Sequence, residues 1–218
     1  WAGVDSPQMA LALFDMARAA GFLTGFELLA RICIDFTMRH AQGAREPLST
    51  AAPWYVLLEY SSHRSIGDAQ TSMQLLLETA LEKGVITDAS IASSLREQGE
   101  FWSLRENLSH IQKPEGGSIK HDISVPVAKI PAFIETAARA VEARVPGARL
   151  FTFGHMGDGN LHYNISQPIG ADKEAFLARW DEVNALVHDI VHEFSGSISA
   201  EHGIGQLKKA ELTRYKQP

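Results

Sequence analysis

The chain has 218 residues, of which 45% are hydrophobic and 21% charged, a composition that excludes a disordered or low-complexity protein. With 26 acidic and 20 basic side chains, its formal net charge is −6, which argues against nucleic acid or an anionic membrane surface as the main partner. Cys33 is the only cysteine, so the chain cannot form an internal disulfide. Charged residues interrupt its longest apolar region, about residues 9–34, so we predict no transmembrane span.

Helices and strands alternate along the chain. Ser6 is a suitable N-cap for a first helix, and Pro7 fits its first turn. The apolar stretch LTGFELL that follows fits either a strand or the start of a helix, since its periodicity decides neither. In the first half of the chain we expect a helix at 6–20, a strand at 54–60, a helix at 67–83, a short strand in VITDASI and a helix at 90–111. In the second half we expect a strand at 118–125, a helix at 127–144, strands at 149–155 and 161–166, a helix at 170–194, a strand in GSISAEH and a helix at 205–215.

The stretch GHMGDGNLH, residues 154–162, places two histidines around a turn sequence. Asp158-Gly159 between two strand-like runs predicts a two-residue hairpin turn. That register sets His155 opposite His162, with Asn164 on the same face. Directly opposed residues have Cβ atoms about 4.5–5.5 Å apart, so two imidazoles could bind one metal ion. The other face of the hairpin is mostly apolar and is expected to pack on helices.

A third candidate metal ligand, Glu201, lies in SISAEHGIG, where Gly196 and Gly203 indicate a tight passage of backbone. Two histidines and one carboxylate leave coordination positions open, as a catalytic metal site requires. A hydrogen-bonded pair of surface histidines would have the same spacing, and a Glu-His dipeptide alone is common on surfaces. The residues by themselves therefore leave metal binding open.

The motifs GHMGDGNLHYNI and GSISAEHGIGQLKKAEL resemble the C-terminal, substrate-side domain of FAD-linked oxidases, a group that includes D-lactate, D-2-hydroxyglutarate and glycolate dehydrogenases. The resemblance covers residues 1–218 and implies an α+β, ferredoxin-like domain with an enlarged antiparallel sheet covered by helices. It also implies that His155, His162 and Glu201 bind a divalent metal, zinc or manganese. By the same resemblance, His202 is the catalytic base.

The segment FWSLRENLSHIQKPEGGSIKHDISVP extends the resemblance to substrate binding. By its motif, Arg105 and Lys120 hold the substrate carboxylate, for which a planar guanidinium and a second positive charge are suited. Ser109, one helical turn past Arg105, stands where relatives often have threonine. Asn164 is expected to donate a hydrogen bond to the substrate. From the sequence alone, Arg105 could instead pair with Glu106 or another carboxylate on an exposed helix.

The resemblance implies oxidation of a D-2-hydroxy acid to a 2-keto acid, with hydride transfer to FAD. We expect the FAD to be bound mainly by a domain that precedes this chain, and a short tail to follow it, so that the chain alone is inactive. The electron acceptor is not identified, a homodimer is left open, and a cytoplasmic, membrane-peripheral or organelle-matrix location is compatible with the sequence. Two alternatives remain: a metal-dependent hydrolase, and a non-catalytic interaction domain held together by a metal.

Overall fold

The computed structural model describes residues 1–63, 65–202 and 214–215. Its strands are β1 (Ala2–Val4), β2 (Leu23–Ala30), β3 (Trp54–Tyr60), β4 (Asp88–Ala89), β5 (Ser118–Ile119), β6 (Asp122–Ser124), β7 (Arg149–His155) and β8 (Asn160–Ser166). Its helices are α1 (Pro7–Ala19), α2 (Arg31–His40), α3 (Ile66–Glu82), α4 (Leu95–Glu106), α5 (Leu108–Ile111), α6 (Ile130–Arg144), α7 (Lys173–Leu177) and α8 (Trp180–Glu193), with 3₁₀ turns η1 (Lys113–Glu115), η2 (Val127–Lys129) and η3 (Met156–Asp158).

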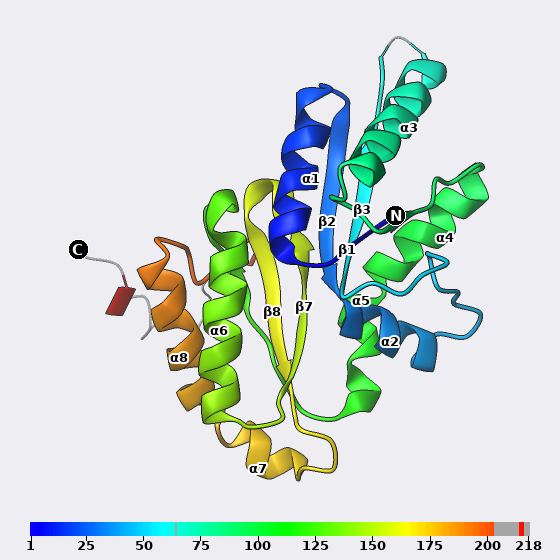
Figure 1. Ribbon diagram of the computed structural model, residues 1–218. Coiled ribbons are helices and arrows are strands. Elements are labelled where there is room, and N and C mark those ends of the chain that lie inside the picture. The colour runs from blue at the N-terminus through cyan, green and yellow to red at the C-terminus, as the bar shows by residue number, and fades with distance from the viewer. Residues whose placement is uncertain (64, 203–213, 216–218) are drawn as a thin grey trace.

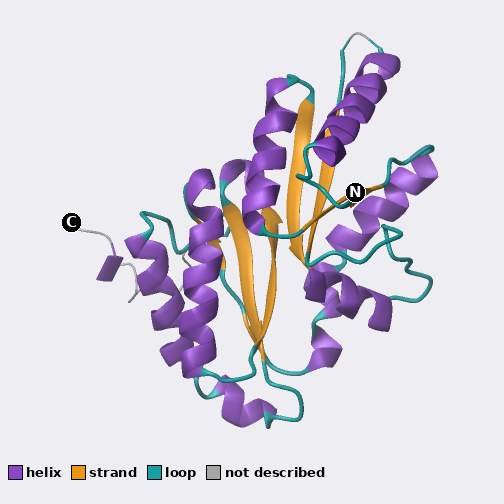
Figure 2. Cartoon of the chain, viewed as in Figure 1, coloured by secondary structure: helices purple, strands orange, loops and turns teal. Residues whose placement is uncertain are grey.

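One antiparallel sheet organises the described part of the chain. Its strand order is β4-β1-β3-β2-β7-β8-β5, and β6 also pairs with β8. Figures 1 and 2 show the central strands between α6 and α8 on one side and α2, α4 and α5 on the other. The expected α+β class, with an enlarged antiparallel sheet covered by helices, is therefore confirmed.

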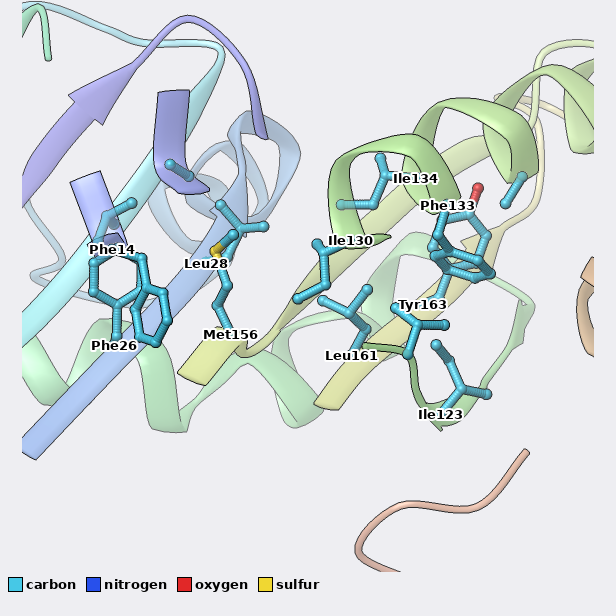
Figure 3. Close-up of a cluster of buried hydrophobic side chains, with 14 of the residues drawn as sticks. Phe14, Phe26, Leu28, Ile123, Ile130, Phe133, Ile134, Met156, Leu161 and Tyr163 are labelled. Atoms are coloured by element: carbon cyan, nitrogen blue, oxygen red, sulfur yellow. The ribbon is translucent and has the colours of Figure 1, made fainter. Parts of the chain in front are cut away.

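The larger core lies between the sheet and the helices α1, α3, α6 and α8. Helix α1 begins as predicted: the hydroxyl of Ser6 accepts a hydrogen bond from the backbone N–H of Met9, at 3.3 Å, and Pro7 occupies the first turn. Figure 3 shows part of this core, in which aromatic and aliphatic side chains of the helices interlock with those of the strands. The labelled members include Phe14, Phe26, Leu28, Phe133, Met156, Leu161 and Tyr163.

A second core lies on the opposite face, where Phe151 and Phe153 of β7 pack against α2, α4 and α5. The sequence analysis did not predict α2, because β2 runs directly into it at Arg31 without a glycine or proline to mark the boundary. It also placed no strand at the start of the chain, where the three residues of β1 are too few to show a periodicity. The ambiguous stretch LTGFELL is strand β2.

The predicted two-residue turn between β7 and β8 is wrong. The connection is the 3₁₀ turn η3, followed by Gly159 at φ +85°, and the register pairs Phe153 with His162. Asp158 fixes this longer turn by accepting the backbone N–H of Asn160 at 3.0 Å. His155 pairs with β2 instead of β8. Because the register moves by two residues, both histidines keep the predicted shared face.

Helix 90–111 is shorter and broken. It begins at Leu95, because the hydroxyl of Ser94 caps it by accepting the backbone N–H of Glu97 at 3.2 Å. At Asn107 the helix divides into α4 and α5. Strand 118–125 is likewise interrupted at residues 120–121, where the backbone N–H of His121 donates to the Asn164 side chain at 3.2 Å instead of to a strand carbonyl.

The C-terminal expectations hold in part. Helix 170–194 begins later and consists of α7 and α8, since Asp172 caps α7 by accepting the backbone N–H of Ala175 at 2.7 Å. The expected strand in GSISAEH is only a single bridge between Ser124 and Ser197. Of the expected helix 205–215, residues 214–215 are described and helical, and the rest lies outside the described residues. None of the helices described combines the length and hydrophobicity needed to cross a bilayer.

Candidate active site

The candidate site lies on the face of the sheet that carries α2, α4 and α5. Two cross-strand pairs form its floor: Glu27 of β2 faces His155 of β7, and Asp122 of β6 faces His162 of β8. Opposed residues of antiparallel strands point to the same face, so each pair brings a carboxylate beside an imidazole.

Glu201 reaches both histidines across more than thirty residues of sequence. Its Oε1 lies 2.9 Å from His155 Nε2, and its Oε2 lies 3.7 Å from His162 Nε2. The predicted approach of Glu201 to the histidine pair is therefore confirmed as a contact. A second grouping overlaps with it: Asp122, His162 and Glu201 hold potential ligand atoms that all lie within 4.8 Å of one another.

Asp122 anchors the loop that carries Glu201. Its Oδ2 accepts the backbone N–H groups of Glu201, at 3.0 Å, and His202, at 2.9 Å, while its Oδ1 accepts the Asn160 amide at 2.8 Å. Burial raises the pKa of Asp122, but these donors outweigh it, and the pKa lies below its ordinary value. Asp122 is thus ionised at neutral pH and holds the loop against the sheet.

The predicted tight passage at Gly196 has a clear cause. A Cβ at this position would lie 2.2 Å from the carbonyl oxygen of Ser124, so only glycine lets the backbone approach β6 this closely. Ser197 then exchanges two backbone hydrogen bonds with Ser124, at 2.8 and 2.9 Å. The glycine therefore sets where the loop with Glu201 begins.

Glu27 joins α4 to the histidines from within the sheet. Its side chain is 3% exposed; Oε2 accepts Arg105 Nε at 2.7 Å, and Oε1 contacts His155 Nδ1. Arg105 is 9% exposed, and its guanidinium lies 4.7 Å from the centre of the Phe153 ring. The alternative of an exposed arginine is wrong: Arg105 does pair with a carboxylate, but with a buried one on the sheet.

His162 is partly buried, with charged groups of both signs nearby. Its ring packs on Phe153, with the ring centres 4.7 Å apart. Burial lowers the pKa of His162, and the nearby charge of Arg105 lowers it further, while Asp122 and Glu201 act in the opposite direction. The ring is therefore neutral at neutral pH, the form in which an imidazole can bind a metal ion.

The remaining predicted residues are distributed around this cluster. Lys120, between β5 and β6, donates to the backbone carbonyl of Ser109 at 3.4 Å, and burial, with Lys113 nearby, lowers its pKa. Asn164 is buried, and its Oδ1 accepts the backbone N–H of His121. Ser109 was expected one helical turn past Arg105 on the same helix. It lies instead in α5, beyond the break at Asn107, and it is exposed whereas Arg105 is buried. His202 is exposed next to Glu201.

Sequence reasoning missed Glu27 and Asp122 as parts of the site. Glu27 had a signal, since it is the single charged residue in the strand LTGFELLA, where an unpaired charge would be costly. Asp122 had none, because an acidic residue in an alternating strand fits a solvent-facing position equally well. Both depend on partners that are distant in sequence.

Cavity size does not mark the site. A cavity of about 780 Å³ opens between α2 and α4, and another of about 510 Å³ lies beside β3, α3 and α4. Neither is lined by His155, His162 or Glu201. The site is distinguished by its set of donor atoms.

Comparison with known proteins agrees with the motifs. The family described as "FAD linked oxidases, C-terminal domain" matches residues 1–218. The chain is 32% identical over 202 residues to a D-2-hydroxyglutarate dehydrogenase of Xanthomonas citri pv. viticola, covering 93% of this chain and 42% of that protein. It is 32% identical over 197 residues to the mitochondrial D-2-hydroxyglutarate dehydrogenase of Arabidopsis thaliana (90% and 34%) and 31% identical over 218 residues to that of Danio rerio (99% and 39%).

The chain therefore spans about two fifths or less of the length of these relatives. The match to the family covers every residue. The two motifs that carried the resemblance also meet in the fold, since Glu201 of the second motif contacts His155 and His162 of the first. The chain belongs to the family of C-terminal domains of FAD-linked oxidases.

Proposed function

We propose that this chain is the substrate- and metal-binding part of an FAD-dependent D-2-hydroxy acid dehydrogenase. The observation that carries the proposal is the meeting of Glu201 with His155 and His162 beside the buried Arg105. Three of the relatives are named D-2-hydroxyglutarate dehydrogenases, so D-2-hydroxyglutarate is the first substrate to test, followed by D-lactate and glycolate. The family supports neither the hydrolase nor the non-catalytic alternative.

The donor atoms fit a divalent metal. Donors that share one zinc ion, at about 2.0–2.2 Å each, lie about 3–3.7 Å apart for bond angles of about 90–120°. The two contacts of Glu201 lie in this range, 2.9 Å from Oε1 to His155 and 3.7 Å from Oε2 to His162, while the ligand atoms that all lie within 4.8 Å of one another are those of Asp122, His162 and Glu201. We assign His155, His162 and Glu201 as the ligands, because both oxygens of Asp122 already accept hydrogen bonds from the loop and from Asn160. Imidazole with carboxylate suits zinc or manganese.

Arg105 and Lys120 would hold the substrate carboxylate. Arg105 gives its Nε to Glu27, so the two Nη groups of its planar fork remain for a second carboxylate. Lys120 adds a positive charge on the same side of the sheet, and within the described residues its Nζ makes one long hydrogen bond, to the backbone carbonyl of Ser109. Asn164 uses its Oδ1 internally, which leaves its amide N–H groups to donate. Ser109 is assigned here only through the family motif.

His202 would accept the proton of the substrate hydroxyl. Its backbone N–H is fixed by Asp122, so its side chain extends from a held position next to Glu201. When bound, the metal supplies a Lewis acid that lowers the pKa of the hydroxyl, and FAD supplies the acceptor for the hydride that leaves C2. The residues of this chain bind the carboxylate, orient the hydroxyl and remove its proton.

The side chains of His155 and Glu201 are each 41% exposed, so the site is open on one side. We propose that an FAD domain of the same protein covers this opening. The plant and fish relatives are named mitochondrial, so an organelle matrix is compatible with the proposal, as is the cytoplasm.

The test is anaerobic reduction of the flavin in the protein that contains this chain together with its FAD domain. We expect D-2-hydroxyglutarate, D-lactate or glycolate to bleach the flavin absorbance, and the L-enantiomers of the first two to leave it unchanged. A flavoprotein that none of the three acids reduces would contradict the proposal.

A further inference from the structure

We propose that Glu27 is a positioning residue that uses a single carboxylate to orient both a metal-binding histidine and the substrate-binding arginine. The inference rests on the proposed function and assigns a role to a residue outside its motifs. Glu27 contacts neither the substrate nor the metal in this scheme. It acts through His155 and Arg105, which come from β7 and α4 and share no other described hydrogen-bond partner.

The sheet fixes where Glu27 can point. Glu27 and His155 are register partners on adjacent antiparallel strands, so their side chains share a face. The carboxylate is 3% exposed and is enclosed between the sheet and α4. Its two oxygens are divided between two partners: Oε2 takes Arg105 Nε, and Oε1 takes His155 Nδ1. A buried charge with both oxygens used holds its partners in a single arrangement.

The contact with Glu27 decides which nitrogen of His155 faces the metal ligands. An ionised carboxylate has no hydrogen to donate, so Nδ1 of His155 must carry the hydrogen of this bond. In the neutral ring, Nε2 then holds a lone pair, and this is the nitrogen that lies 2.9 Å from Glu201 Oε1. A proton on Nε2 or a bound cation satisfies this contact, and with Nδ1–H held by Glu27 it is Nε2 that is free to exchange its proton for a metal. Glu27 thus selects the tautomer that can bind a metal.

The same carboxylate sets the plane of the Arg105 guanidinium. With Nε given to Glu27 and the ring of Phe153 below the group, rotation of the fork is restricted on two sides. The Nη groups are therefore presented in a fixed direction. One carboxylate links the position of the metal ligand to the position of the substrate anchor, so loss of Glu27 should disturb both.

The chain offers a matched control for a purely structural role. Glu59 on β3 also ties α4 to the sheet, since its Oε2 accepts Trp102 Nε1 at 2.9 Å. Both glutamates therefore bind a side chain of the same helix through one carboxylate oxygen. Glu59 contacts none of the proposed ligands, so it separates the effect of holding α4 from the effect of orienting His155.

The experiment compares Glu27→Gln and Glu59→Gln in the flavoprotein that contains this chain. A glutamine offers one acceptor oxygen instead of two. Its NH₂ group would face either Arg105 or the Nδ1 of His155 and could not accept a hydrogen bond from either, so one of the two partners would lose its contact. We expect Glu27→Gln to lower the affinity for zinc or manganese, titrated against a chelator, by about 10- to 100-fold. It should also raise KM for D-2-hydroxyglutarate by at least about 10-fold. Glu59→Gln should lower only the melting temperature.

Glu27→Asp guards against loss of folding, because it keeps the buried negative charge but withdraws it by one methylene group. We expect this variant to fold and still to bind metal more weakly than wild type. Wild-type metal affinity and KM in Glu27→Gln, or in Glu27→Asp if only that variant folds, would overturn the role of Glu27 and leave the proposed function standing. A wild-type protein without affinity for either metal would contradict both.

Discussion

Two buried carboxylates on one face of the sheet have similar surroundings and different uses. Glu27, beside the end of β7, contacts an arginine and a histidine, Arg105 and His155. Glu115, beside the start of β7, also contacts a histidine, His40 at 2.6 Å, together with the two arginines Arg39 and Arg149. Their side chains are 3% and 8% exposed. The residue types alone do not separate the two clusters.

The two clusters differ in what the histidine contacts besides the buried glutamate. Behind His155, the second ring nitrogen meets Glu201, which also reaches His162. Glu115 instead binds the histidine and both arginines with its own oxygens and joins α2, η1 and β7. A carboxylate between an arginine and a histidine therefore indicates a metal site only where the second ring nitrogen of the histidine contacts another potential ligand. We expect changes near Glu27 to affect catalysis and changes at Glu115 to affect stability.

The largest effect is expected for Glu201→Gln. The substitution removes the only carboxylate among the three proposed ligands, and the side chain is 41% exposed. Metal content after dialysis should fall to near zero, and kcat/KM should fall by more than about 100-fold, beyond the usual effect of losing an outer-shell partner. Metal analysis and steady-state kinetics check this. Wild-type metal content in the variant would remove Glu201 from the ligand set.

A smaller effect is expected for Arg105→Ala. In the flavoprotein, kcat/KM should fall by about 30- to 1,000-fold, the range for losing a buried charge-assisted contact. The free energy of unfolding should also fall, because Glu27 would keep a buried charge without its partner. Denaturant unfolding separates the two effects. Unchanged kinetics with a lowered free energy of unfolding would show that the ion pair of Arg105 with Glu27 is purely structural, like the ion pairs of Glu115.

Glu115→Gln should reverse this pattern. Arg149, whose side chain is 15% exposed, would lose its carboxylate partner, and we expect the free energy of unfolding to fall by about 2 kcal/mol. The kinetic parameters should stay at wild-type values, because no proposed site residue contacts Glu115. A fall in kcat/KM without a change in unfolding would show that the cluster of Glu115 serves the site.

The smallest effect concerns pH. Burial raises the pKa of Glu115, but His40, Arg149 and Arg39 outweigh it and lower the pKa to about 2. Because the folded pKa is depressed, the stabilisation is complete above the unfolded value, about 4.3, and is lost as the pH falls toward 2. The stability difference between wild type and Glu115→Gln should therefore shrink between about pH 5 and pH 2. A difference that stays constant over this range would assign the stabilisation to packing alone.

The sequence predicted those parts of the site that depend on local pattern. The strands that carry His155 and His162 follow from alternation, and the turn between them follows from Asp158-Gly159, although its length does not. The length was wrong: His155 pairs with β2 instead of β8, and the Asp158 side chain accepts the backbone N–H of Asn160 within a longer turn. The shared face still held, since a shift of two residues preserves the side-chain alternation.

The parts that failed depend on contacts between distant segments. Glu27 is recognisable as a site residue only once β2 lies beside β7, and Asp122 only once the loop after α8 returns to β6. The break at Asn107 separates Ser109 in α5 from Arg105 in α4. Glu201 was a candidate ligand from its own segment, but the residues alone left metal binding open, and the family resemblance joined it to the histidines.

The most direct test of the account is anaerobic flavin reduction by D-2-hydroxyglutarate in the intact flavoprotein, before and after a chelator removes the metal. Metal analysis of each sample should accompany the measurement. The account predicts that reduction slows by more than about 100-fold in the metal-free protein and returns when zinc or manganese is restored. A verified metal-free protein that reduces its flavin at the original rate would contradict the assignment of His155, His162 and Glu201 as a catalytic metal site.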